Sequence, residues 1–163
     1  MECDMDFLDV GYMGENFDAS DIFGKLHTIK RSDKKAMQIF IALPSLDDGL
    51  INEIQVIDKF FDSAQVPLHC CVVFGKLDER VKELSKSCQK CQILIDSEDE
   101  FGGMYGVGDS ETGLSKTLFV LGREGAIYHV QTPLKPSTAF DLEQLRIELN
   151  KTFLTYNGVG CHG

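Results

Sequence analysis

Two continuous apolar stretches, joined by a segment of helical spacing, constrain this sequence more than any other feature. Residues 36–43 and 67–74 each indicate a strand with apolar side chains on both faces, as in a sheet covered by helices on both sides. Between them, residues 45–48 resemble a helix-capping box, and apolar residues follow at helical spacing to about Asp62. This part of the chain predicts a strand–helix–strand unit.

The rest of the chain extends this alternation. We expect helices at 78–87, 98–105 and 142–153, a strand at 92–96, and a β-hairpin formed by 116–121 and 126–131. Residues 1–26 suggest an extended region or short hairpin, and the glycine-rich tail 156–163 is expected to be mobile. The order β-α-β-α-β-α-β-β-α predicts one α/β domain spanning 1–163. Its thioredoxin-like arrangement would have a central mixed sheet flanked by helices.

Charge and hydropathy exclude several classes of partner. The net charge of −10 and pI near 4.7 argue against binding to nucleic acid or to anionic lipid. The longest apolar run, residues 39–43, is far shorter than the roughly 20 residues of a membrane-spanning helix. The acidic N-terminus lacks the basic start of a secretory signal, so we expect a cytoplasmic protein whose cysteines are reduced by default.

Three motifs point to a known family. The loop 41–51 contains Pro44, Ser45 and Asp47 in a Pro-Ser-x-Asp pattern, residues 101–107 end in Tyr-Gly-Val, and a Gly-Leu pair precedes the strand and hairpin of 116–125. Together they resemble the thiol peroxidase family of atypical two-cysteine peroxiredoxins, within the thioredoxin-like superfamily. The resemblance implies peroxide reduction by a thiolate, a homodimer and a thioredoxin-type reductant, with no metal and no cofactor.

The sequence differs from the family pattern at the positions that carry the family's catalytic groups. The family's peroxidatic cysteine stands seven residues after the proline, and Ile51 occupies that position here. Asp48 replaces a threonine, and its charge would repel a thiolate. Lys116 replaces an arginine and lacks the guanidinium fork. The resemblance therefore implies a degenerate site at Pro44, Asp48, Ile51 and Lys116, with standard peroxidase catalysis absent or very weak.

A purely structural reading of the same loop stays open. Pro44 can end a strand, Asp47 or Asp48 can cap the following helix, and Ile51 can begin its apolar stripe. In that case Ile51 packs beneath the Pro44 loop instead of lining an open pocket.

Cys88 and Cys91 form a C-x-x-C pair, a spacing that can close a small disulfide or supply half of a zinc site. The resemblance matches Cys88 to the family's resolving cysteine. The pair follows a helix, whose carbonyl end should raise the thiol pKa values. This position disfavours fast reductase chemistry but allows a slow or regulatory disulfide. The polar residues beside both cysteines predict that both thiols are exposed.

The other cysteines offer weaker alternatives. Cys70 and Cys71 are adjacent in an expected strand, so they should face opposite sides as core residues. A zinc site would need Cys161 and His162 of the tail to join the C-x-x-C pair. Two hypotheses remain: a redox protein whose remaining thiol chemistry uses Cys88 and Cys91, and a non-catalytic pseudo-peroxiredoxin that acts as a binding or regulatory module.

Overall fold

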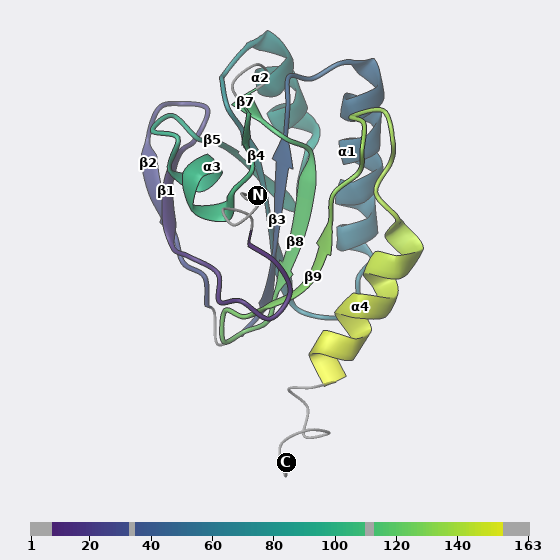
Figure 1. Cartoon of the computed structure of the whole chain (residues 1–163). Coiled ribbons are helices and arrows are strands. Elements are labelled where there is room, and N and C mark those ends of the chain that lie inside the picture. The colour runs from purple at the N-terminus through teal and green to yellow at the C-terminus, as the bar shows by residue number, and fades with distance from the viewer. Residues whose placement is uncertain (1–7, 33–34, 110–112, 155–163) are drawn as a thin grey trace.

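The computed structural model describes residues 8–32, 35–109 and 113–154, and a seven-stranded mixed sheet forms its centre (Figure 1). The strand order is β2-β1-β5-β4-β3-β8-β9. The strands are β1 (Phe17–Ser20), β2 (Leu26–Ile29), β3 (Met37–Leu43), β4 (Leu68–Phe74), β5 (Cys91–Ile95), β8 (Thr117–Leu121) and β9 (Ile127–Gln131). β3, β4 and β5 are parallel, and the other neighbours pair antiparallel. The expected central mixed sheet is confirmed.

Helices cover both faces of this sheet. α1 (Asp48–Asp62), α2 (Glu79–Ser87) and α4 (Leu142–Leu154) share one hydrophobic cluster, while the short α3 (Glu100–Tyr105) packs into a second cluster. Figure 1 shows α1 and α4 on one side of the sheet and α3 on the other. A separate small sheet pairs β6 (Gly108–Asp109) with β7 (Gly113–Leu114), which the sequence pattern does not predict.

The two apolar stretches form the middle of the sheet, as their composition requires. All seven residues of β3 are buried, and β3 pairs with β4 in register from Met37 opposite Leu68 to Leu43 opposite Phe74. Cys70 lies in the cluster under α1, and Cys71 lies in the cluster on the opposite face. The expectation that these two cysteines face opposite sides is confirmed.

Two local predictions need correction. The capping box expected from Ser45 does not form, because Ser45 is exposed and precedes the cap. The alternative cap at Asp47 is confirmed, since its carboxylate accepts the backbone N–H of Leu50 at 2.8 Å. The N-terminal hairpin extends to Ile29, beyond the expected limit, because β1 and β2 pair antiparallel around a turn that Asp21 stabilises.

The tail expected to be mobile lies outside the described residues. None of the helices described is long and apolar enough to cross a membrane.

The capping assignment is directly testable. Asp47→Ala should lower the free energy of unfolding by about 1 kcal/mol, the usual loss for an N-cap whose side chain satisfies a free backbone N–H. Ser45→Ala is the matched control and should change it by less than about 0.5 kcal/mol, as surface substitutions do. Urea denaturation measures both variants, and equal losses would contradict the assignment.

Candidate functional site

The loop after β3 and the first turn of α1 form the candidate site. Pro44 is buried where β3 ends, and Asp47 fixes the start of the helix. Ile51 follows in the first helical turn, with its N–H bonded to the carbonyl of Asp47 at 3.0 Å. Ile51 is half-buried and packs against the cluster of Ile54 and Leu50. An aliphatic side chain therefore occupies the position where the resemblance expects a nucleophile.

Asp48 lies at the surface of the first turn of α1. Its side chain is 95% exposed, and its carboxylate forms an ion pair at 3.0 Å with Arg80 of α2. The sequence predicts that its charge acts on the residue at position 51. Solvent and Arg80 screen that charge, so the repulsion is weaker than the sequence alone suggests.

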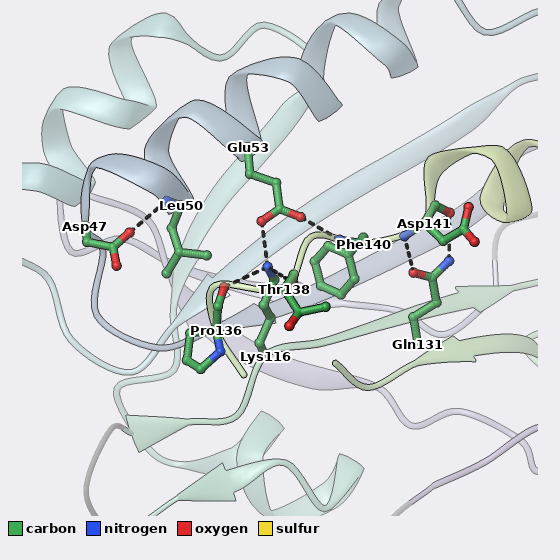
Figure 2. Close-up of polar contacts among 9 residues, drawn as sticks. All are labelled: Asp47, Leu50, Glu53, Lys116, Gln131, Pro136, Thr138, Phe140 and Asp141. Atoms are coloured by element: carbon green, nitrogen blue, oxygen red, sulfur yellow. Dashed lines mark hydrogen bonds and ion pairs between the residues drawn. The ribbon is translucent and has the colours of Figure 1, made fainter. Parts of the chain in front are cut away.

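Lys116, directly before β8, is buried and fully engaged (Figure 2). Its Nζ lies 2.6 Å from a carboxylate oxygen of Glu53, 2.7 Å from the carbonyl oxygen of Thr138 and 3.0 Å from that of Pro136. An ammonium group has three protons to donate, and these acceptors account for all three. Lys116 therefore has no donor left for a peroxide or a thiolate.

The same ion pair attaches the segment 136–140 to α1. The second oxygen of Glu53 accepts the N–H of Phe140 at 2.7 Å, and the Lys116 ammonium lies 4.9 Å from the centre of the Phe140 ring. Gln131 of β9 continues this attachment, because its side chain bonds both the N–H and the carbonyl of Asp141 (Figure 2). The local sequence pattern does not mark Glu53, because all of its partners lie far away along the chain.

A cleft of about 410 Å³ lies between α1 and this segment. Asn52 and Val56 line it from the helix, and Ser137, Ala139 and Leu142 line it from the opposite side. Ile51 does not line this cleft. The segment 136–140 therefore forms one wall of the cleft beside α1, and the cleft is not centred on Ile51.

The cysteine pair lies on the same face of the sheet as α1. Cys88 follows the last residue of α2 and is half-buried, and Cys91 begins β5 and is only 6% exposed. The expectation that both thiols are exposed is wrong for Cys91, because β5 carries it into the core. Cys91 instead lies against Cys70 of β4, with 3.4 Å between their Sγ atoms. From the sequence, Cys70 is expected only to pack in the core.

Asp58 of α1 holds the turn between these two cysteines. Its carboxylate accepts the backbone N–H groups of Gln89, Lys90 and Cys91 at 2.8–3.2 Å. The side chain is buried although it carries a charge. Asp58 is not among the residues expected from the sequence, although a signal exists: an acidic residue four positions after Ile54 falls on the apolar face of the helix.

The remaining candidates from the sequence are not assembled into a site. Cys161 and His162 lie outside the described residues, so the zinc alternative stays a prediction. Within the parts of the chain that are described, no three histidine, cysteine or acidic side chains cluster as metal ligands.

No protein-family model and no curated protein matches this sequence. Solved structures do match. A peroxiredoxin-like protein from Aquifex aeolicus superposes with a TM-score of 0.76 at 19% identity, over 90% of this chain and 88% of that one. A thiol peroxidase from Chromobacterium violaceum gives 0.75 at 14% identity, also over 90% and 88%. A reduced 2-Cys peroxiredoxin from Plasmodium vivax gives 0.75 at 11% identity, over 91% and 84%. This chain has the peroxiredoxin-like thioredoxin fold.

Within this peroxiredoxin-like fold, the protein environment favours the protonated thiol at Cys70, Cys71 and Cys88. Burial is the main factor that raises the pKa of Cys88 to about 12, and the neighbouring Cys91 and Asp58 add to it. Burial likewise raises the pKa of Cys71 to about 12 and that of Cys70 well above its ordinary value. Nucleophilic attack requires a thiolate, so these thiols should react slowly at neutral pH.

The packing of Ile51 can be measured against a neighbour on the same helix. Ile54 is fully buried, so Ile54→Ala should cost about 2–5 kcal/mol of stability. Ile51→Ala should cost clearly less, because the Ile51 side chain is only partly buried, yet more than the roughly 0.5 kcal/mol of a surface change. Chemical denaturation of both variants decides this. A loss below 0.5 kcal/mol for Ile51→Ala would mean that the site is open.

Removal of the Asp58 charge tests the turn. Burial alone would raise the pKa of Asp58, but the N–H donors of Gln89, Cys91 and Lys90 outweigh burial and lower it. The stabilisation is therefore present above about pH 4, the ordinary carboxyl range, and is lost as the pH falls through the lowered pKa. Asp58→Asn should cost about 1–3 kcal/mol at pH 7 and progressively less below pH 4.

The exposed Asp62 on the same helix provides the control. Asp62→Asn should leave the free energy of unfolding nearly unchanged at both pH values. A loss for Asp58→Asn that is the same at pH 7 and pH 3 would contradict the role of the charge.

Proposed function

We propose that this chain is a peroxiredoxin-like protein that has lost peroxide reduction at the start of α1 and serves as a non-catalytic binding or regulatory module. The observation that carries this proposal is the environment of Ile51. A hydrocarbon side chain stands where a thiolate would have to attack the O–O bond, and the nearby cation Lys116 is bound to Glu53. The site therefore lacks both the nucleophile and a free positive charge.

The attached segment 136–140 supports a binding role over a vestigial enzyme. Glu53 and Lys116 hold this segment against α1 and leave the cleft that Asn52 and Val56 line beside it. A preformed cleft with mainly apolar walls and a few polar groups is the usual form of a small-ligand site. The module would use this cleft in place of the peroxide pocket.

A second candidate function is slow thiol–disulfide exchange at Cys88 and Cys91. Partial exposure of Cys88, three residues before a second thiol, favours it. A thioredoxin-type protein would then act as the reductant. The raised pKa of Cys88 argues for a regulatory rate and against a catalytic one.

The cellular setting belongs to the same proposal. We place the protein in the cytoplasm as a homodimer, without metal or cofactor and without affinity for nucleic acid or membranes. Its strongly acidic composition supports the last two statements.

Peroxide consumption tests the main proposal. With thioredoxin, thioredoxin reductase and hydrogen peroxide, the wild type should show no turnover above background. Ile51→Cys alone should recover little, because Lys116 remains bound to Glu53 and carries no guanidinium fork. Adding Asp48→Thr and Lys116→Arg should increase turnover further.

Two outcomes separate the candidates. Wild-type turnover in the range of an ordinary peroxiredoxin would overturn the loss of activity. A weak turnover that Cys88→Ser abolishes would instead favour the second candidate function.

A further inference from the structure

Three of the four described cysteines gather on one face of the sheet. Cys70 and Cys91 are directly opposite each other on the parallel strands β4 and β5. Their Sγ atoms are 3.4 Å apart, and Cys88 packs against the same hydrophobic cluster. Cys71 lies in the cluster across the sheet. A thiol pair in the core thus adjoins one thiol that reaches the surface.

The spacing of β4 and β5 allows a disulfide bond between Cys70 and Cys91. Neighbouring strands lie about 4.8 Å apart, within the range of roughly 4.4–6.8 Å that separates the Cα atoms of disulfide-bonded cysteines. The sulfur atoms would need to approach by only about 1.4 Å to reach bonding distance. Side-chain rotation on a fixed backbone can supply most of this movement.

We propose that Cys70 and Cys91 form a reversible buried disulfide that is oxidised and reduced through Cys88. The proposal goes beyond the loss of peroxidase activity. It rests on the second candidate function, because the first disulfide formed is the one between Cys88 and Cys91.

Solvent access gives the order of events. Cys70 is 2% exposed and Cys91 is 6% exposed, so neither presents its sulfur to a reagent in solution. Cys88 is half-buried and is the accessible thiol of the three. An oxidant or a reductant must therefore reach the pair through Cys88, or through local opening of β5.

The chemistry balances with a low-molecular-weight disulfide, such as oxidised glutathione, as the oxidant. The Cys88 thiolate attacks one sulfur of that disulfide and releases one small thiol. Cys91 attacks Cys88 Sγ and releases the second small thiol, which leaves a Cys88–Cys91 disulfide. Cys70 then attacks Cys91 Sγ, which forms Cys70–Cys91 and returns Cys88 to a thiol. Two protein thiols are oxidised and one small disulfide is reduced to two thiols.

Asp58 acts as the positioning residue of this relay. Its bonds to the N–H groups of Gln89, Lys90 and Cys91 fix the turn that joins Cys88 to β5. The turn keeps Cys91 in register with Cys70 while Cys88 stays at the end of α2. The sulfur of Cys91 can then change its disulfide partner from Cys88 to Cys70 without movement of the strands.

The experiment follows disulfides with time in the full chain carrying Cys3→Ser and Cys161→Ser. Oxidised glutathione is added, samples are quenched by alkylation, and non-reducing peptide mapping identifies each disulfide. Cys88–Cys91 should appear first and Cys70–Cys91 should accumulate later. Cys70→Ala should stop the sequence at Cys88–Cys91, and Cys88→Ser should slow formation of Cys70–Cys91 at least tenfold.

Cys71→Ala is the matched control, since it removes a buried thiol from the same strand on the other face. It should leave the order and the rates unchanged. Thermal melts establish that each variant is folded, and Cys70→Ser replaces any Cys70→Ala protein that is not.

Each alternative result has a distinct meaning. If Cys88–Cys91 forms and persists in the presence of Cys70, the relay is wrong and the exchange at Cys88 and Cys91 survives. If no disulfide forms among the three cysteines, both proposals are wrong. If Cys70–Cys91 forms equally fast in Cys88→Ser, Cys88 is not the route.

Discussion

The burial of β3 and β4 on both faces is the constraint from which the rest of this structure follows. Two strands without a polar face must lie in the middle of a sheet and need helices on each side. Their parallel pairing requires a crossover, which α1 supplies. The carboxyl ends of both strands, Leu43 and Phe74, then lie side by side. The loop of Pro44 and the first turn of α1 are placed at that edge by the same requirement.

The ion pair between Glu53 and Lys116 determines whether this edge of the sheet has a free positive charge. A buried pair is tolerated only when its remaining hydrogen-bonding groups are satisfied, and here two carbonyl groups and one N–H complete the set. The satisfied pair holds the segment before α4 against α1. Because every donor of Lys116 is used, the charge has a structural role and is not available to stabilise an anion. The start of α1 therefore offers neither a nucleophile at Ile51 nor a free positive charge at Lys116.

The sequence predicted the features that depend on local spacing. Apart from the short β6 and β7, the helices and strands from β3 to α4 lie at nearly their expected positions, because apolar periodicity and turn residues encode them locally. Asp58, Glu53 and the contact of Cys70 with Cys91 were missed, since each depends on two elements meeting in space. The register of β4 against β5 decides that Cys70 faces Cys91, and periodicity carries no information on register between distant strands.

The carboxylate of Asp58 both stabilises the turn between Cys88 and Cys91 and contributes to the low reactivity of Cys88. The backbone N–H groups that Asp58 accepts keep its carboxylate charged although it is buried. That fixed negative charge contributes, after burial and Cys91, to the raised pKa of Cys88. The carboxylate that holds the turn in place therefore adds to the burial that keeps the accessible thiol protonated. A peroxidase needs the opposite arrangement, in which positive charge favours the thiolate. The cysteine cluster therefore lacks the main requirement for fast peroxide chemistry, which is a stabilised thiolate, and Ile51 at the start of α1 offers no thiol.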